Sequence, residues 1–217
     1  MLIIGAGGFA KEVLQICHDN EELENLTFYD DVNPYIGEML FNKFPIIKNL
    51  DQAKAYLETK DNRFALGLGK PDLRKLLYER FLELGGILTS TISPAATIGN
   101  YGTKLGDGCN ILSGSVISNS VSIGKGCLVY FNSVITHDCS LGDFVEVSPL
   151  VKFLGRVTIK NYCQIGAGST ILPDVIIGEN VIIGAGSVVT KDIPDNSLAV
   201  GIPAKVVKKL EPFDISI

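Results

Sequence analysis

The sequence predicts two domains, a small α/β domain with a Rossmann-like parallel sheet (residues 1–88) and a parallel β-helix (residues 89–217). Much of the second half carries an aliphatic or phenylalanine residue at every sixth position, which is the hexapeptide signature of a β-helix. The first half instead alternates short apolar runs with helical patterns, as is typical of a parallel sheet. At 217 residues and 46% hydrophobic residues, the chain is long enough for one domain of ordinary size and a small one.

The N-terminal part begins with an apolar run at residues 2–4, a glycine-rich turn at 5–10 and a helix at 11–17. Glycines in such a turn let the backbone approach a phosphate, although a mere tight turn explains them equally well. The segment supplies about one of the two halves that a dinucleotide needs, so we expect it to hold one nucleotide, or a sugar carried on one. The further expected elements are strand 26–29 ending in Asp30 and Asp31, helix 51–58, strand 64–68 ending in Gly69, helix 72–84 and strand 86–89.

The β-helix is expected from a period of six that continues without a break. Four residues after each in-phase residue lies a small or β-branched one, which suits the tight corner of a triangular coil. Three hexapeptides make a coil of eighteen residues, and coils stack about 4.8 Å apart, so about five coils are expected. Ile98 to Leu105 takes seven residues, which predicts an irregular first coil. The in-phase residues are Leu105, Ile111, Ile117, Ile123, Val129, Ile135, Leu141, Val147, Phe153, Ile159, Ile165, Ile171, Ile177, Ile183 and Val189.

Composition excludes several classes of protein. The net charge is −5 and basic residues are scattered, which argues against a nucleic-acid or membrane-surface partner. We expect a cytoplasmic protein, because no export signal precedes the first strand. Most of the five cysteines fall on inward positions of the repeat, which favours reduced packing cysteines. No metal is expected, since the two histidines cannot supply the three ligands of a zinc hydrolase.

His137 is the candidate catalytic residue. It follows the in-phase residue Ile135 by two positions, so it lies on the outward side of the coil, where a solvated surface histidine is the alternative. The carboxylate of Asp138 is placed to support the imidazole as a general base. His18, at the end of the first helix, is expected to be structural.

The eighteen-residue coil predicts what stacks over this pair. Gly155 is expected over His137, where it leaves space beside the imidazole and directs its N–H toward a thioester oxygen. Arg156 is expected over Asp138. As a hypothesis, Arg156 pairs with Asp138 and competes for the carboxylate that would otherwise support His137.

Several motifs together resemble the sialic acid O-acetyltransferase (NeuD-like) family of bacterial sugar acyltransferases, which includes N-acetyltransferases that act on nucleotide-linked 4-amino sugars. They are Gly5-Ala6-Gly7-Gly8-Phe9-Ala10, Phe28-Tyr29-Asp30-Asp31, Gly69 with Arg74, Thr136-His137-Asp138-Cys139 and Gly201-Ile202-Pro203-Ala204-Lys205. The resemblance covers nearly the whole chain and implies a left-handed β-helix.

The resemblance also implies roles for individual residues. The nucleotide sugar would lie at Gly7, Gly8, Phe9, Asp30, Asp31 and Gly69, and His137, supported by Asp138, would accept the proton of the attacking amine. Acetyl-CoA would lie between two β-helices of a homotrimer, near Gly155, Ala167, Ala185 and Pro203. Family members often carry a second histidine, which touches the acyl-CoA, nine residues after the first. Here that position is Glu146, which leaves open whether the acyl donor is contacted in the same way and whether the donor is the same; a solvated outward side chain explains Glu146 equally well.

The leading hypothesis is therefore acetyl-CoA-dependent N-acetylation of a nucleotide-linked 4-amino sugar, with direct attack on the thioester. A sugar O-acetyltransferase using the same base is the alternative within the enzymes. A non-catalytic scaffold that binds a sugar nucleotide is the alternative from another class. The nucleotide base and the sugar stereochemistry stay undetermined at this point.

Overall fold

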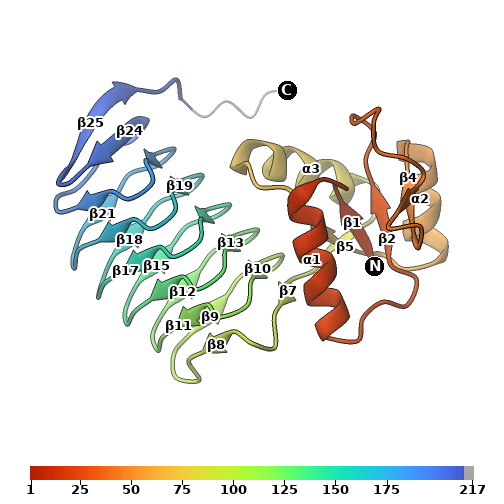
Figure 1. The fold of residues 1–217 in the computed structure, drawn as a ribbon, viewed down its shortest axis with the longest axis horizontal. Coiled ribbons are helices and arrows are strands. Elements are labelled where there is room, and N and C mark those ends of the chain that lie inside the picture. Colours follow the sequence, from red (N-terminus) through yellow and green to blue (C-terminus); the bar gives the residue numbers. More distant parts are fainter. Residues whose placement is uncertain (213–217) are drawn as a thin grey trace.

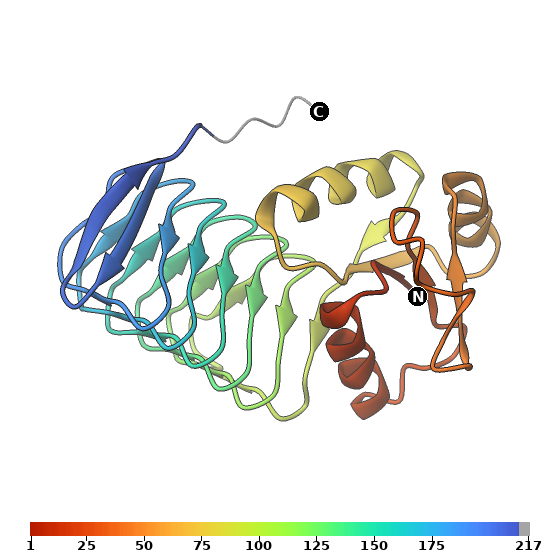
Figure 2. The same cartoon turned by 45° about the horizontal axis from the view of Figure 1, so that its top comes forward.

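The computed structural model describes residues 1–212 and has an α/β domain packed against the side of a long β-helix (Figures 1 and 2). In the N-terminal domain the strand order is β3-β4-β2-β1-β5-β6, and all neighbours are parallel except β3 and β4. The elements are β1 (Leu2–Ile4), α1 (Gly8–Asp19), β2 (Thr27–Tyr29), β3 (Met39–Leu40), β4 (Phe44–Ile47), α2 (Leu50–Thr59), β5 (Arg63–Leu66), α3 (Pro71–Glu83) and β6 (Ile87–Leu88).

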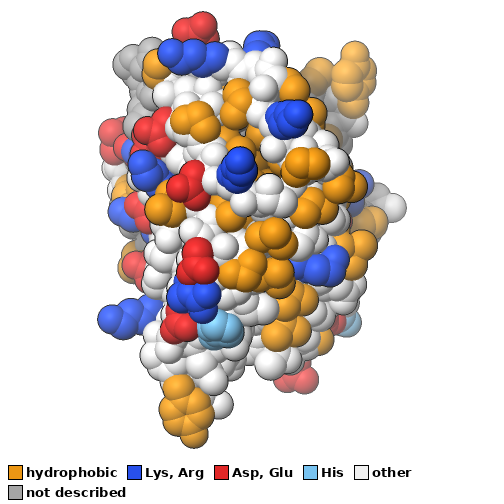
Figure 3. Space-filling model, turned by 90° about the vertical axis from the view of Figure 1, so that its left-hand side faces the viewer, with side chains coloured by type: hydrophobic (Ala, Val, Ile, Leu, Met, Phe, Trp, Pro, Cys, Tyr) orange, Lys and Arg blue, Asp and Glu red, His pale blue; other side chains and the backbone are white. Residues whose placement is uncertain are grey.

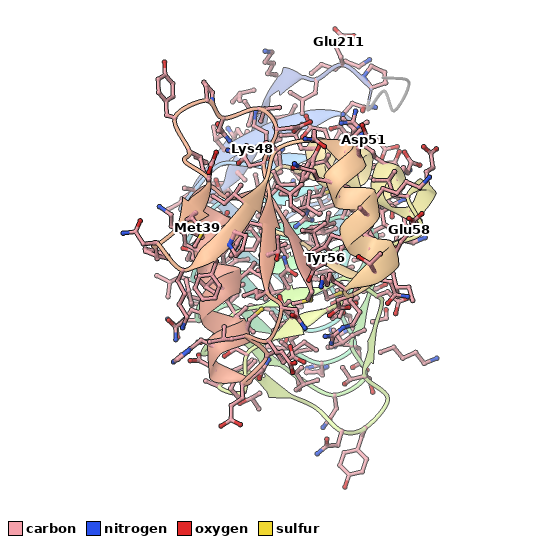
Figure 4. All side chains as sticks on the ribbon, turned by 90° about the vertical axis from the view of Figure 1, so that its right-hand side faces the viewer. Met39, Lys48, Asp51, Tyr56, Glu58 and Glu211 are labelled. Atoms are coloured by element: carbon pink, nitrogen blue, oxygen red, sulfur yellow. The ribbon has the colours of Figure 1, made fainter. Side chains whose placement is uncertain are left out.

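Apolar residues on both faces of this sheet explain its helical cover. Ile3 and Phe28 pack with α1 on one face, whereas Leu2 and Phe64 pack with α2 and α3 on the other. Figure 4 shows α2 on the outer side of the sheet, and Tyr56 is one of its three buried residues. The expected helix at 11–17 was too short, because α1 already begins at Gly8 inside the glycine-rich turn. The short hairpin of β3 and β4 was not predicted.

The β-helix has three faces, each a ladder of parallel two-residue strands, and face 1 ends in the longer antiparallel pair β24 and β25. Face 1 consists of β7 (Thr91–Ile92), β10 (Asn110–Ile111), β13 (Leu128–Val129), β16 (Glu146–Val147), β19 (Gln164–Ile165), β22 (Ile182–Ile183), β24 (Ser197–Gly201) and β25 (Ala204–Lys209). Face 2 consists of β8 (Thr97–Ile98), β11 (Val116–Ile117), β14 (Val134–Ile135), β17 (Lys152–Phe153), β20 (Thr170–Ile171) and β23 (Val188–Val189). Face 3 consists of β9 (Lys104–Leu105), β12 (Ser122–Ile123), β15 (Ser140–Leu141), β18 (Thr158–Ile159) and β21 (Ile176–Ile177).

The predicted eighteen-residue register is confirmed. Ile117 pairs with Ile135, and Ile135 with Phe153, one coil apart. The in-phase residues and the small residues that follow them fill one continuous apolar core. This is the left-handed parallel β-helix that the resemblance implies. All five cysteines are buried thiols, and four of them belong to this core.

The N-terminal domain packs on face 1 and on the neighbouring corner between faces 3 and 1. The side-chain amide of Asn110 donates to the Leu66 carbonyl at 2.6 Å. The ring of Tyr78 on α3 lies 5.5 Å from that of Phe144, measured between centroids. No helix within residues 1–212 is long and apolar enough to cross a membrane.

Candidate functional site

His137 and Asp138 lie at the edge between faces 2 and 3, called edge 2–3 below, in the corner that joins β14 to β15. Nδ1 of His137 is 2.7 Å from Oδ2 of Asp138, and the two side chains are 57% and 52% exposed. An ionised carboxylate favours the tautomer in which Nδ1 carries the hydrogen, so the lone pair of Nε2 is left to accept a proton. The pair is thus open to solvent, and its geometry allows Nε2 to accept a proton.

Gly155 stacks over His137, as the period predicts. The Arg156 N–H donates to the His137 carbonyl at 3.1 Å, which sets the register. A Cβ on Gly155 would lie 2.6 Å from Cε1 and 2.9 Å from Nε2 of the imidazole, closer than side-chain carbons approach. Among the described residues, the Gly155 N–H has no hydrogen-bond acceptor. Glycine at this position therefore makes room for the imidazole and leaves an amide donor beside it.

The hypothesis that Arg156 pairs with Asp138 is wrong. The Arg156 guanidinium forms a fork with Asp174, one coil further on, with Nε and Nη2 at 2.6 and 2.9 Å from the two carboxylate oxygens. These bonds raise the pKa of Arg156 and lower that of Asp174. Asp138 is already bonded to His137, so its carboxylate is not diverted.

The glycines of the N-terminal domain fall into two groups. Gly5 has a φ of +101°, and a Cβ there would lie 2.9 Å from the Gly67 carbonyl oxygen, so the protein itself requires this glycine. A Cβ on Gly7, Gly8 or Gly69 would meet nothing within 4 Å, and none of these has a positive φ. Neither packing nor backbone conformation demands these three glycines, whereas close approach of a ligand to the backbone would.

The two aspartates after β2 have different surroundings. The Asp30 carboxylate is buried and accepts hydrogen bonds from the backbone N–H groups of Ala6 at 3.1 Å and Asn33 at 3.0 Å. It therefore ties the glycine-rich turn to the loop that follows β2. Asp31 is exposed and accepts a bond from the Tyr29 hydroxyl at 2.8 Å. A small cavity at this edge of the sheet is lined by Ile4, Gly5, Tyr29, Asp30, Asp31, Val32, Asn33, Leu68 and Leu77.

Phe9 lies at the junction of the two domains, with its ring centroid 5.3 Å from that of Tyr130. Glu146, on β16, faces the same junction and receives a long hydrogen bond from Ser148 at 3.4 Å. Burial raises the pKa of Glu146, and the positive charge of Arg74 opposes this rise. Arg74 is completely buried, which the sequence did not predict. Within residues 1–212 its Nη2 donates to the Val145 carbonyl, and Nε and Nη1 have no protein partner.

The residues expected at acetyl-CoA do not meet within one chain. Gly155 lies on edge 2–3, whereas Ala167 and Ala185 are exposed one above the other on the edge between faces 1 and 2, called edge 1–2. Pro203 is exposed in the turn between β24 and β25. The glycine-rich turn lies near edge 1–2, because Phe9 packs on Tyr130 at the end of β13. Face 2 thus separates the glycine-rich turn from His137.

Edge 2–3 is opposite face 1 in a triangular coil, and the N-terminal domain covers face 1. Figure 3 looks at the molecule from the side away from that domain, and a histidine, charged side chains and a field of hydrophobic side chains share this surface. The exposed apolar residues of face 2 and its edges include Val116 and Leu150. No group of three potential metal-binding side chains occurs in the described part of the chain.

Comparisons with known proteins agree with this architecture. The family model of the PglD N-terminal domain matches residues 1–81, and that of the bacterial transferase hexapeptide repeats matches residues 102–137 and 156–191. PerB from Caulobacter crescentus, solved in complex with CoA and GDP-perosamine, is 29% identical with a TM-score of 0.88, over 95% of this chain and 96% of that one.

Two other solved proteins share the fold over the same length. The acetyltransferase domain of PglB from Neisseria gonorrhoeae, in complex with acetyl coenzyme A, is 28% identical with a TM-score of 0.84, over 95% of this chain and 98% of that one. WeeI from Acinetobacter baumannii is 26% identical with a TM-score of 0.85 and the same coverage.

Curated relatives match only a short part of the chain. The galactoside O-acetyltransferase of Lactococcus lactis is 51% identical over 59 residues, which are 27% of this chain and 28% of that protein. The chain spans about a third of the length of the curated relatives that it matches. With a PglD N-terminal domain followed by hexapeptide repeats, and near full-length likeness to PerB, PglB and WeeI, the chain fits the NeuD-like family of sugar acyltransferases.

Proposed function

We propose that the protein is an acetyl-CoA-dependent N-acetyltransferase acting on the amino group of a nucleotide-linked 4-amino sugar. The observation that carries this proposal is the His137–Asp138 pair beneath Gly155 on an exposed edge of the β-helix. The joint presence of this pair and a mononucleotide-sized domain favours an acceptor that carries a nucleotide. The complexes of PerB with CoA and GDP-perosamine and of PglB with acetyl coenzyme A support the same substrate classes.

The chemistry follows from the geometry at edge 2–3. The sugar nitrogen attacks the thioester carbonyl carbon while Nε2 of His137 takes a proton from this nitrogen. The carbonyl oxygen becomes negative in the tetrahedral intermediate, where the Gly155 N–H is a suitable donor. The C–S bond then breaks, and the imidazolium returns its proton to the departing CoA thiolate. Asp138 holds the ring and stabilises its positive charge.

The nucleotide-binding half rests on the three open glycines and on Asp31. Gly7 and Gly8 lie at the N-terminus of α1, where N–H groups and the helix dipole favour a diphosphate. Asp31 is the exposed aspartate and the better candidate for a ribose or base contact. Asp30 would act by holding the turn, because its carboxylate is already occupied. Phe9 would help to position the glycine-rich turn by packing on Tyr130, rather than contact the phosphates directly.

Acetyl-CoA is the proposed donor, and a homotrimer with active sites between subunits is the proposed assembly. If one copy brings its edge 2–3 against edge 1–2 of a partner, its His137 and Gly155 would lie beside the partner's glycine-rich turn. The same approach would set Gly155 opposite the partner's Ala167 and Ala185, with Pro203 further along the groove. Glu146 lies on the adjoining face 1, where its carboxylate would meet the donor in place of a histidine.

The first test is thiol release from acetyl-CoA with UDP-, dTDP- and GDP-linked 4-amino sugars and free sialic acid. We expect turnover on a nucleotide-linked amino sugar and a loss of roughly 100-fold or more in His137→Ala, the usual scale for a general base. His18→Ala is the matched control, since His18 is exposed on α1. Turnover on a free sugar only would favour the O-acetyltransferase, and silence with retained sugar-nucleotide binding would favour the scaffold.

Placement of the site between subunits has its own test. Mixing His137→Ala subunits with Asp31→Ala subunits, after reversible dissociation, should restore part of the activity. Some interfaces then combine an intact base with an intact nucleotide domain. Mixtures that stay as inactive as the separate variants would place the whole site within one chain.

A further inference from the structure

The irregular first coil creates an exposed aromatic side chain on the catalytic edge. The step from β8 to β9 is one residue longer than a regular hexapeptide, and the extra length falls at the corner on edge 2–3. Tyr101 lies in this corner with 77% of its surface exposed. Its side chain is larger than those at the equivalent positions of the next three coils, Asn119, His137 and Gly155.

The longer corner is anchored to the next coil. The Tyr101 N–H donates to the side-chain oxygen of Asn119 at 3.2 Å, and the Tyr101 carbonyl accepts from the Ser120 N–H at 2.8 Å. The Thr103 hydroxyl donates to the Ser118 carbonyl at 2.9 Å. Because the backbone is held at these points, the ring projects from a fixed base.

Tyr101, Asn119 and His137 form one column along edge 2–3. The Asp138 N–H donates to the Asn119 carbonyl at 3.4 Å, which continues the ladder from Asn119 to the catalytic pair. Each coil adds about 4.8 Å, so Tyr101 begins roughly 10 Å below His137. Above His137 the column opens at Gly155, where the thioester is expected. An acceptor that approaches from the other side would therefore extend along Asn119 and Tyr101.

We propose that Tyr101 is a specificity-determining residue, whose ring packs against the pyranose of the acceptor while the sugar amine lies at His137. This inference rests on the proposed function, because it takes His137 as the base. A sugar ring has apolar C–H faces, and a tyrosine side chain, with only two rotatable bonds, covers such a face at little entropic cost. The side-chain oxygen of Asn119, one coil nearer to His137, accepts from the Tyr101 N–H, so its NH2 group is left to donate to the sugar hydroxyls.

The test compares steady-state kinetics of Tyr101→Ala and Tyr101→Phe with the unchanged protein. We expect KM for the amino-sugar nucleotide to rise about tenfold in Tyr101→Ala, as for loss of one aromatic contact, and to recover in Tyr101→Phe. KM for acetyl-CoA should not change. Leu82→Ala, an exposed apolar position on α3, is the control for loss of surface area.

Binding measurements separate the sugar from the nucleotide. Calorimetry should show equal affinity of Tyr101→Ala and unchanged protein for the nucleoside diphosphate without the sugar. A parallel loss of affinity for the diphosphate would overturn the pyranose contact, as would an unchanged acceptor KM or dissociation of the oligomer in Tyr101→Ala. If His137→Ala keeps full activity, the proposed function fails. If His137→Ala loses activity but the Tyr101 variants keep the kinetics of the unchanged protein, only this inference fails.

Discussion

Replacing Gly155 by alanine should lower the activity strongly and leave the stability of the fold almost unchanged. The added Cβ would lie 2.6 Å from Cε1, 2.9 Å from Nε2 and 3.4 Å from Nδ1 of His137, so the imidazole must move by a substantial fraction of an ångström or more. The backbone of Gly155 lies outside the left-handed region, so alanine meets no conformational barrier there. The imidazole is 57% exposed and can rotate outward.

The expected cost in stability is therefore below about 1 kcal/mol, as for a surface substitution. The expected cost in activity is large, because a displacement of about 1 Å in a catalytic group costs roughly 100-fold. Rotation of the ring would also lengthen the 2.7 Å contact between Nδ1 and the Asp138 carboxylate. We expect kcat for thiol release to fall by about two orders of magnitude, with little change in the melting temperature.

Gly37→Ala is the matched control, because a Cβ at Gly37 meets nothing within 4 Å and this glycine has no proposed role. Both variants should be measured by thiol release under saturating acetyl-CoA and by thermal unfolding. Near-normal turnover in a folded Gly155→Ala protein would refute the reasoning, since the imidazole would then not need its present position. A large drop in melting temperature would show instead that Gly155 is required by the coil.

Three other variants follow from the charged groups. Asp138→Asn removes the carboxylate that supports the imidazole, so kcat should fall by at least tenfold while KM for both substrates changes little, as initial rates would show. Arg156→Ala should leave kcat nearly unchanged, because Arg156 is paired with Asp174 and not with Asp138; a fall as large as that in Asp138→Asn would contradict this assignment. Burial raises the pKa of Asp61, but hydrogen bonds, led by that from Arg63, outweigh burial, so the pKa in the folded protein is lowered. These bonds therefore contribute stability above about pH 4, and this stability is lost as the pH falls further. Asp61→Asn should therefore be less stable at pH 7, and its free energy of unfolding should depend less on pH below about pH 4, as urea titrations at several pH values would show.

The β-helix was predictable because each hexapeptide repeats the same local rule. Every in-phase residue from Ile111 to Val189 is buried, and the register carried the prediction directly to the contact between Gly155 and His137. A strict repeat converts spacing in the sequence into contacts in space, which a fold without a repeat does not allow.

The conformation of the corners was less predictable. The residue three positions after each in-phase residue often adopts a positive φ, even where it is Phe144 (φ +55°) or Tyr162 (φ +60°). Such side chains do not favour this region on their own. Here their rings stack with an interplanar angle of 15°, and the N–H of Tyr162 is bonded to the coil below. Stacking between coils thus overrides local preference.

Side-chain partners were the least predictable feature of the site. The period places Asp138, Arg156 and Asp174 in one column, and spacing alone does not tell which aspartate the arginine chooses. The choice follows from His137, because one carboxylate is already bonded to the imidazole. Burial of Arg74 depends on how the two domains meet, which no local pattern describes.

In the proposed site the nucleotide half and the base lie at two different edges of the β-helix, so neither edge of one chain would be sufficient. Phe9 packs on Tyr130 and so holds the glycine-rich turn close to edge 1–2, while His137 lies on edge 2–3, across the whole width of face 2. A rigid β-helix cannot bend to join them. Assembly by edge contact would solve the problem without any movement, since one rigid body carries the nucleotide half for one neighbour and the base for another. The exposed apolar residues Val116, on face 2, and Leu150, on edge 1–2, are then the expected apolar contacts between subunits.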